Sequence, residues 1–112
     1  QLKNFALKTA ASLRHDAESN SPILEVITPD RPGLLAHLAQ IFMRFELRVL
    51  NAKISTLGER VEDIFYLTDN NFEPLADNEV STALTEAICS ELDQRNEEEG
   101  QEYKLRKMKV WN

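Results

Sequence analysis

The stretch ITPDRPGLLAHLAQIF, from Ile27 to Phe42, places a turn-forming segment directly before a helix. The helix is predicted by an apolar stripe at helical spacing, made of Leu34, Leu38, Ile41 and Phe45. The segment PDRPG in front of it has two explanations. In the structural one, Asp30 caps the helix, Pro32 fits its first turn and Gly33 allows close packing. In the functional one, N–H groups of Arg31, Gly33 or Leu34 stay open at the helix start and bind a carboxylate.

Length and composition limit the classes of protein. A chain of 112 residues with 42% hydrophobic and 29% charged residues is one small domain of ordinary globular composition. The net charge of −6 argues against nucleic acid and an anionic membrane as partners, and no apolar run approaches the roughly 18 residues of a membrane span. Cys89 is the only cysteine, which excludes an internal disulfide and fits a reducing cytoplasm. The first residue, Gln1, suggests a piece of a longer polypeptide.

Strands and a second helix are predicted from hydrophobic spacing. Four segments have alternating or β-branched patterns typical of strands: residues 5–15, 23–27, 47–57 and 60–68. Gly58 and Glu59 would join the last two strands in a type II′ turn, because glycine accepts a positive φ at its first position. A second helix is expected after an N-cap at Asp77 and continues at helical spacing to Leu92.

The element order is therefore β-β-α-β-β-α, which indicates an α+β, ferredoxin-like two-layer sandwich. We expect a four-stranded antiparallel sheet with two helices on one face. The N-terminal strand, paired at the edge with Ile23–Ile27, would replace the usual fourth strand. The predicted domain spans residues 1–94, with the extra strand at 5–15 and a βαββα core at 23–92; a charged C-terminal tail follows at 95–112.

One face of this sheet has no helix to cover it. Ile23, Ile64 and Tyr66 are assigned to that face by strand alternation. Exposed apolar groups of this kind favour self-association, or contact with the rest of a longer chain.

Two blocks of sequence resemble a known family. LEVITPDRPGLLAHLAQIF is similar to the strand–loop–helix opening of ACT domains, small regulatory folds that bind amino acids in many metabolic enzymes. LNAKISTLGERVEDIFYLTD, from Leu50 to Asp69, resembles the C-terminal ACT domain of bacterial bifunctional uridylyltransferase/uridylyl-removing enzymes, which modify the nitrogen regulator PII. The resemblance covers roughly Phe5 to Leu92 and fails from Arg95 on.

The resemblance implies a cytoplasmic regulatory domain that senses glutamine, controls nitrogen assimilation and reaches the PII protein through its parent enzyme. The catalytic domains of such a parent, with magnesium or manganese by resemblance, are not in this chain, so no cofactor is predicted for the fragment itself. We predict no catalytic residue and no metal ligand. His15 and His37 are interpreted as solvated side chains, and Cys89 as a part-buried residue.

The resemblance also implies a ligand site. In ACT domains the effector commonly lies between this loop and the second strand of a neighbouring ACT domain. The predicted ligand-binding residues are Asp30, Arg31, Pro32, Gly33 and Leu34, with Asn51 of an adjacent copy. The carboxylate of glutamine would meet the helix-start N–H groups, its ammonium Asp30 and its side-chain amide Asn51. Two alternatives remain: a ferredoxin-like dimerisation or protein-interaction module without a small-molecule ligand, and an acylphosphatase-like enzyme in which Arg31 and Asn51 cradle a phosphate.

Overall fold

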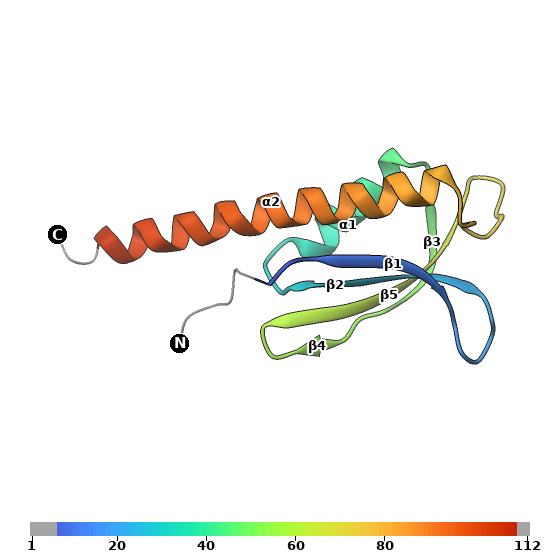
Figure 1. The fold of residues 1–112 in the computed structure, drawn as a ribbon, viewed down its shortest axis with the longest axis horizontal. Helices are drawn as coiled ribbons and strands as arrows, with labels where there is room; N and C mark the ends of the chain where they lie inside the picture. Colours follow the sequence, from blue (N-terminus) through green and yellow to red (C-terminus); the bar gives the residue numbers. More distant parts are fainter. Residues whose placement is uncertain (1–6, 110–112) are drawn as a thin grey trace.

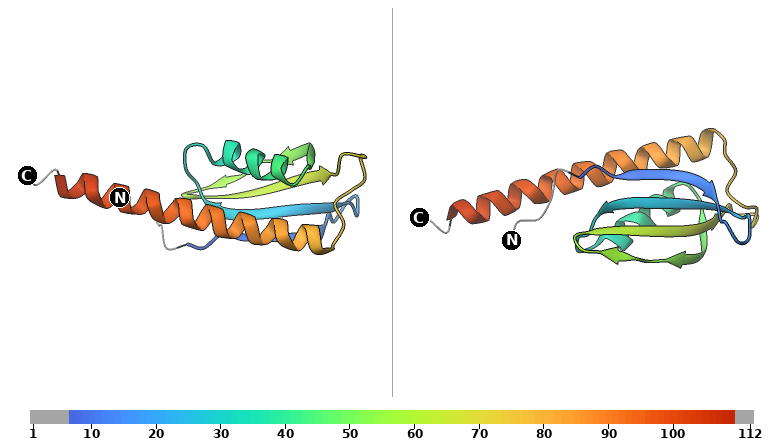
Figure 2. Two further views of the ribbon diagram at one scale, coloured as in Figure 1. Left: turned by 90° about the horizontal axis from the view of Figure 1, so that it is seen from above. Right: turned by 60° about the horizontal axis from the view of Figure 1, so that its bottom comes forward.

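A computed structural model describes residues 7–109, which form one sheet covered by two helices (Figure 1). In chain order the elements are β1 (Ala10–His15), β2 (Pro22–Pro29), α1 (Leu34–Arg44), β3 (Arg48–Lys53), β4 (Thr56–Leu57), β5 (Arg60–Thr68) and α2 (Glu79–Lys109). The strands are antiparallel in the order β1-β2-β5-β3, and the short β4 pairs with β5. Both helices cover the same face of the sheet (Figure 2). The predicted α+β, ferredoxin-like fold is confirmed.

The N-terminal strand lies at the sheet edge next to β2, as predicted. The register pairs Ala10 with Ile27 and Leu13 with Leu24, and α2 runs above this edge (Figure 1). The strand begins at Ala10, later than the predicted start at Phe5, which lies outside the described residues. α2 remains helical to Lys109 and provides no further strand, so β1 takes the place of the fourth strand.

The core lies between the sheet and the helices, because alternate residues of β2 and β5 point toward them. These strands contribute Leu24, Val26, Val61, Phe65 and Leu67, and the helices contribute Leu34, Leu38, Ile41, Phe42, Leu84, Ile88 and Leu92. The rings of Phe42 and Phe65 meet edge to face with centroids 5.1 Å apart, an arrangement that aromatic pairs favour. This packing holds α1 against β5.

The predicted strand 47–57 is divided in the structure. β3 ends at Lys53, Ile54 and Ser55 lie outside the strands, and β4 resumes at Thr56. The sheet formed by residues 7–109 therefore has five strands rather than four. The interruption redirects the chain toward the β4–β5 hairpin. Gly58 has a φ of 67° and Glu59 has no positive φ, as the predicted type II′ turn requires.

The start and end of α2 differ from the prediction. Asn78, and not Asp77, caps the helix, because the Asn78 side-chain oxygen accepts hydrogen bonds from the N–H groups of Val80 and Ser81 at 2.9 and 3.2 Å. The helix is continuous from Glu79 to Lys109 and extends beyond the sheet (Figure 1). It therefore passes without a break through the expected boundary at residues 94 and 95.

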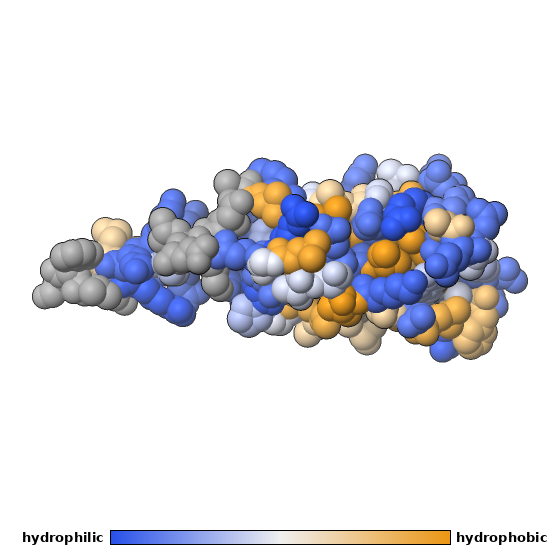
Figure 3. All heavy atoms as spheres, turned by 90° about the horizontal axis from the view of Figure 1, so that it is seen from below, coloured by the Kyte–Doolittle hydropathy of each residue, from blue (hydrophilic) through white to orange (hydrophobic). Residues whose placement is uncertain are grey.

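The apolar residues predicted for the helix-free face are covered to different extents. Ile64 and Tyr66 are half-buried, but Ile23 is only 1% exposed, so its prediction as an available surface residue is wrong. Larger exposed side chains lie on β3 and the segment that follows it: Val49, Leu50, Ile54 and Leu57. Figure 3 shows hydrophobic groups among hydrophilic ones on the globular part, whereas the projecting end of α2 is mainly hydrophilic.

Candidate functional site

The turn between β2 and α1 is shaped by Gly33. It is the N-cap residue of α1 and has a φ of 79°, in the left-handed region that favours glycine. No side chain in the described part of the chain caps the helix, so the prediction that Asp30 does so is wrong. The Asp30 N–H instead donates to the Glu59 carbonyl at 2.8 Å, which ties the turn to the β4–β5 hairpin.

Backbone donors remain open at the start of α1. The Leu34 N–H donates to the Arg31 carbonyl at 3.3 Å, and the His37 N–H donates to Gly33 at 3.0 Å. Within residues 7–109, the N–H groups of Leu35 and Ala36 have no hydrogen-bond acceptor. With the positive end of the helix dipole behind them, such donors suit an anion.

These donors face an open hollow of about 340 Å³. It is lined by the turn and the first residues of α1, the β3–β4 segment and β5: Asp30, Arg31, Gly33, Leu34, Leu35, Ala36, Ile54, Thr56, Val61 and Asp63. Four of the predicted ligand-binding residues, Asp30, Arg31, Gly33 and Leu34, thus lie together. A Cβ built on Gly33 would meet no atom within 4 Å, so this side of the turn is open.

Asp63 is a residue of the hollow that sequence reasoning missed. It is 1% exposed, although it is a charged residue, because it belongs to the helix-facing residues of β5. Its Oδ1 accepts a long hydrogen bond of 3.4 Å from the Ser55 N–H, and its Oδ2 has no partner among the described residues. Burial raises the pKa of the Asp63 carboxyl, and the negative charge of Asp30 acts in the same direction. The available sequence signal was its place between Val61 and Phe65 on the buried face.

Arg31 connects the turn to α2. It is 7% exposed; its Nε donates to the Asn96 side-chain oxygen at 3.2 Å, and its Nη2 lies 2.8 Å from His37 Nδ1. Asn96 in turn lies 3.5 Å from the hydroxyl of Thr28. Burial is the main cause that lowers the pKa of Arg31, but an arginine keeps its charge in proteins. The guanidinium is therefore engaged in holding the turn against α2.

Comparison with known proteins identifies the family of the chain. Residues 17–95 match the family model described as the ACR family N-terminal ACT domain. The chain belongs to the ACT domain family.

Relatives of this ACT domain share its sequence over most of its length. The chain is 50% identical over 99 residues to a protein of Stutzerimonas stutzeri (strain A1501) named "Bifunctional uridylyltransferase/uridylyl-removing enzyme". These 99 residues are 88% of this chain and 11% of the relative. Proteins of the same name from Pseudomonas aeruginosa (strain LESB58) and Ectopseudomonas mendocina (strain ymp) are 51% and 49% identical over 86% and 82% of this chain. The ACT domain thus spans about a tenth of the length of these relatives, 10% to 11%.

Two of the predicted ligand-binding residues do not line the hollow of the ACT domain. Pro32 is exposed in the turn but is not part of the lining. Asn51 lies on the exposed strand β3, and its side-chain oxygen accepts a hydrogen bond of 2.9 Å from the Ala52 N–H. The Arg31 guanidinium and Asn51 are therefore not brought together around one phosphate within a single chain.

His37 is bonded on both sides, so its interpretation as a solvated residue is wrong. Its Nδ1 faces Arg31, and its Nε2 lies 3.4 Å from Glu91 Oε1 on α2. Glu91 also forms an ion pair with Arg44. Burial acts to raise the pKa of Glu91, but hydrogen bonds from Arg44 and His37 outweigh it, and the net pKa is lowered. These contacts join α1 to α2 in the ACT domain.

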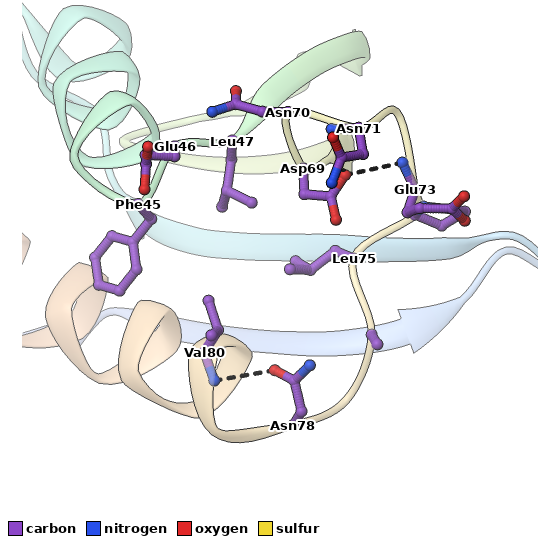
Figure 4. Close-up of a pocket in the computed structure, with 12 residues that line it drawn as sticks. Phe45, Glu46, Leu47, Asp69, Asn70, Asn71, Glu73, Leu75, Asn78 and Val80 are labelled. Carbon is purple, nitrogen blue, oxygen red and sulfur yellow. Dashed lines mark hydrogen bonds between the residues drawn. The ribbon is translucent and has the colours of Figure 1, made fainter.

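A second hollow, of about 550 Å³, lies at the other end of α1 (Figure 4). Its polar groups pair with one another: Asp69 Oδ1 accepts from the N–H groups of Asn71 and Glu73 at 2.8 and 3.0 Å, and Asn78 caps α2. Because these acceptors are already engaged, the first hollow is the stronger candidate for a ligand site.

Residues 7–109 of the ACT domain offer neither a metal-ion cluster nor a membrane-crossing helix. Over residues 7–109, no three or more histidine, cysteine, aspartate or glutamate residues are grouped in a way that suits a metal ion. In the same part of the chain, no helix combines the length and the hydropathy that a membrane crossing requires.

Proposed function

We propose that this chain is a regulatory ACT domain that senses an amino acid, glutamine, for a bifunctional uridylyltransferase/uridylyl-removing enzyme. The observation that carries the proposal is the hollow at the start of α1, which is lined both by residues with open backbone donors and by carboxylates. A free amino acid has the matching pair of charges. The names of relatives that match most of the chain support the choice of parent enzyme.

The amino acid binds with its carboxylate at the N–H groups of Leu35 and Ala36, where the helix dipole favours negative charge. Its ammonium meets a carboxylate of the hollow. Leu35 and Ile54, which are 50% and 49% exposed, offer apolar surface to the methylene groups of the side chain. Asn51 of an adjacent ACT domain completes the site by hydrogen bonding the side-chain amide, since Asn51 lies outside the hollow of its own chain.

The proposal extends to the parent enzyme. The domain occupies the C-terminal part of a cytoplasmic enzyme that modifies the PII protein in nitrogen control. The chemistry, with magnesium or manganese, belongs to other domains of that enzyme, and the present domain reports the amino acid concentration to them. Binding transmits the difference in affinity between two states of the enzyme, typically about 1–3 kcal/mol.

A second candidate function is a dimerisation or protein-interaction module without a small-molecule ligand. It is favoured by β3, all six residues of which are exposed at the open edge of the sheet. Val49 and Leu50, 46% and 62% exposed, place apolar side chains on the same strand. An open edge with apolar groups pairs readily with another strand. The two functions are compatible if the adjacent copy supplies Asn51.

Calorimetric titration with glutamine, together with sedimentation of the same sample, separates these functions. We expect binding near millimolar affinity, about −4 kcal/mol, and a self-associated species. Glutamate and asparagine serve as control ligands of altered charge and length. Self-association without any heat of binding would leave the interaction module as the function. A Leu50→Lys variant compared with Ile64→Lys shows whether the edge strand or the helix-free face makes the contact.

A further inference from the structure

We propose that Asp63 is the residue that selects for a free α-ammonium group, so that the ligand of the hollow is an unblocked amino acid. This inference rests on the proposed function and deepens it. The charges of the turn predict that the ammonium meets Asp30; the geometry points to Asp63, which lines the same hollow from β5.

The carboxylate of Asp63 lacks partners that a buried charge requires. The residue is 1% exposed, its Oδ2 has no hydrogen-bond partner among the described residues, and its Oδ1 has one distant donor, the Ser55 N–H at 3.4 Å. Buried charges in proteins are ordinarily paired and hydrogen-bonded. A cation in the hollow would supply both kinds of interaction.

No side chain of the hollow supplies that cation. Among the described residues, Arg31 is the one cationic residue in the lining, and its guanidinium is engaged by Asn96, His37 and the Pro32 carbonyl. The other carboxylate, Asp30, is exposed, so water already solvates it. The free energy gained from an incoming ammonium is therefore larger at Asp63 than at Asp30, because charge–charge attraction is stronger away from solvent.

The donors and the carboxylate that line the hollow fit an α-amino acid in one orientation. The donors of Leu35 and Ala36 take the carboxylate, and Asp63 takes the ammonium on the same α-carbon. Rotation about the final torsion of the aspartate, which is broad, presents either oxygen to the hollow. Acylation of the amino group removes its charge, so an N-acetylated ligand loses this interaction.

The inference is tested with two ligands and three proteins. Glutamine and N-acetylglutamine are titrated into the wild-type chain, Asp63→Asn and the control Asp30→Asn, which removes an exposed carboxylate from the same hollow. We expect the wild type to prefer glutamine by about 10- to 100-fold. The preference should fall to nearly onefold in Asp63→Asn and persist in Asp30→Asn.

The outcomes distinguish this inference from the proposed function. If Asp63→Asn keeps the wild-type preference, Asp63 does not select the ammonium, while the glutamine-sensing function stands. If the wild-type protein binds neither ligand, both fail. A measurement without any variant gives the same decision: the carboxyl carbon resonance of Asp63 should shift on addition of glutamine and stay unchanged with N-acetylglutamine. A shift that is equal for both ligands would overturn the assignment.

Discussion

Replacement of Asp63 by asparagine should make the unliganded protein more stable at neutral pH. Asparagine has nearly the same shape but no charge. The carboxylate that it replaces is 1% exposed, and its Oδ2 has no partner among the described residues. An unsatisfied buried polar group costs about 1–3 kcal/mol, and more when charged. The asparagine amide is still a buried polar group, so only part of that cost is removed. We therefore expect the free energy of unfolding to rise by about 1 kcal/mol, which corresponds to about 4–8 °C in Tm.

The gain should depend on pH in a defined direction. Burial raises the pKa of Asp63 in the folded state, so the folded protein binds more protons than the unfolded chain above the ordinary carboxyl pKa of about 3.9. The stability of the wild type therefore falls as pH rises from that value through the raised pKa. Below the ordinary pKa both states are protonated, and the difference between wild type and Asp63→Asn should nearly vanish.

Urea unfolding of both proteins at several pH values, from about pH 4 to pH 7.5, measures this difference. Asp30→Asn is the matched control, because Asp30 is exposed and its replacement should change stability by less than about 0.5 kcal/mol. A variant Asp63→Asn that is less stable than the wild type at neutral pH would refute the reasoning. So would a difference that does not change with pH.

Three further perturbations test other contacts. Asn96→Ala should lower the free energy of unfolding in urea by about 2–3 kcal/mol, because it removes the acceptor of the buried Arg31 Nε. The control is Gln94→Ala, which changes an exposed residue, and equal effects of the two variants would contradict the role of this contact. Glu91→Gln should lower the free energy of unfolding by up to about 1 kcal/mol at neutral pH. This difference from the wild type should disappear as pH falls through the lowered pKa of Glu91, and a difference that persists in acid would count against the ion pairs of Glu91. Gly33→Val should lower the free energy of unfolding by about 1–2 kcal/mol, through backbone strain alone, because a Cβ at this position would meet no other atom within 4 Å. Gly33→Asn should lower it by less, since asparagine tolerates a left-handed backbone; equal losses would argue against the left-handed turn.

The contacts of Arg31 explain why part of the candidate site could be predicted and part could not. PDRPG is a local signal, so the sequence located the turn and the start of α1 within a few residues. The role of Arg31 depends on Asn96, 65 residues away, which no local pattern connects to it. The position of Asp30 outside the helix cap was likewise not predicted: Gly33 is the N-cap, and the Asp30 N–H bonds to the Glu59 carbonyl of the β4–β5 hairpin.

The sequence by itself determined the fold class, the edge position of β1 and the family resemblance. Each depends on periodicity, turn residues or short motifs, which act through the local backbone and through which face of an element is apolar. Only the tertiary structure decided that Asp63 is buried, since its exposure depends on β5 packing beneath α1 and the β3–β4 segment. The same holds for the break at Ile54 and Ser55 and for the unbroken course of α2 beyond residue 94. These features arise where segments distant in the sequence meet, and the free energy of such contacts depends on both segments, so neither segment alone predicts it.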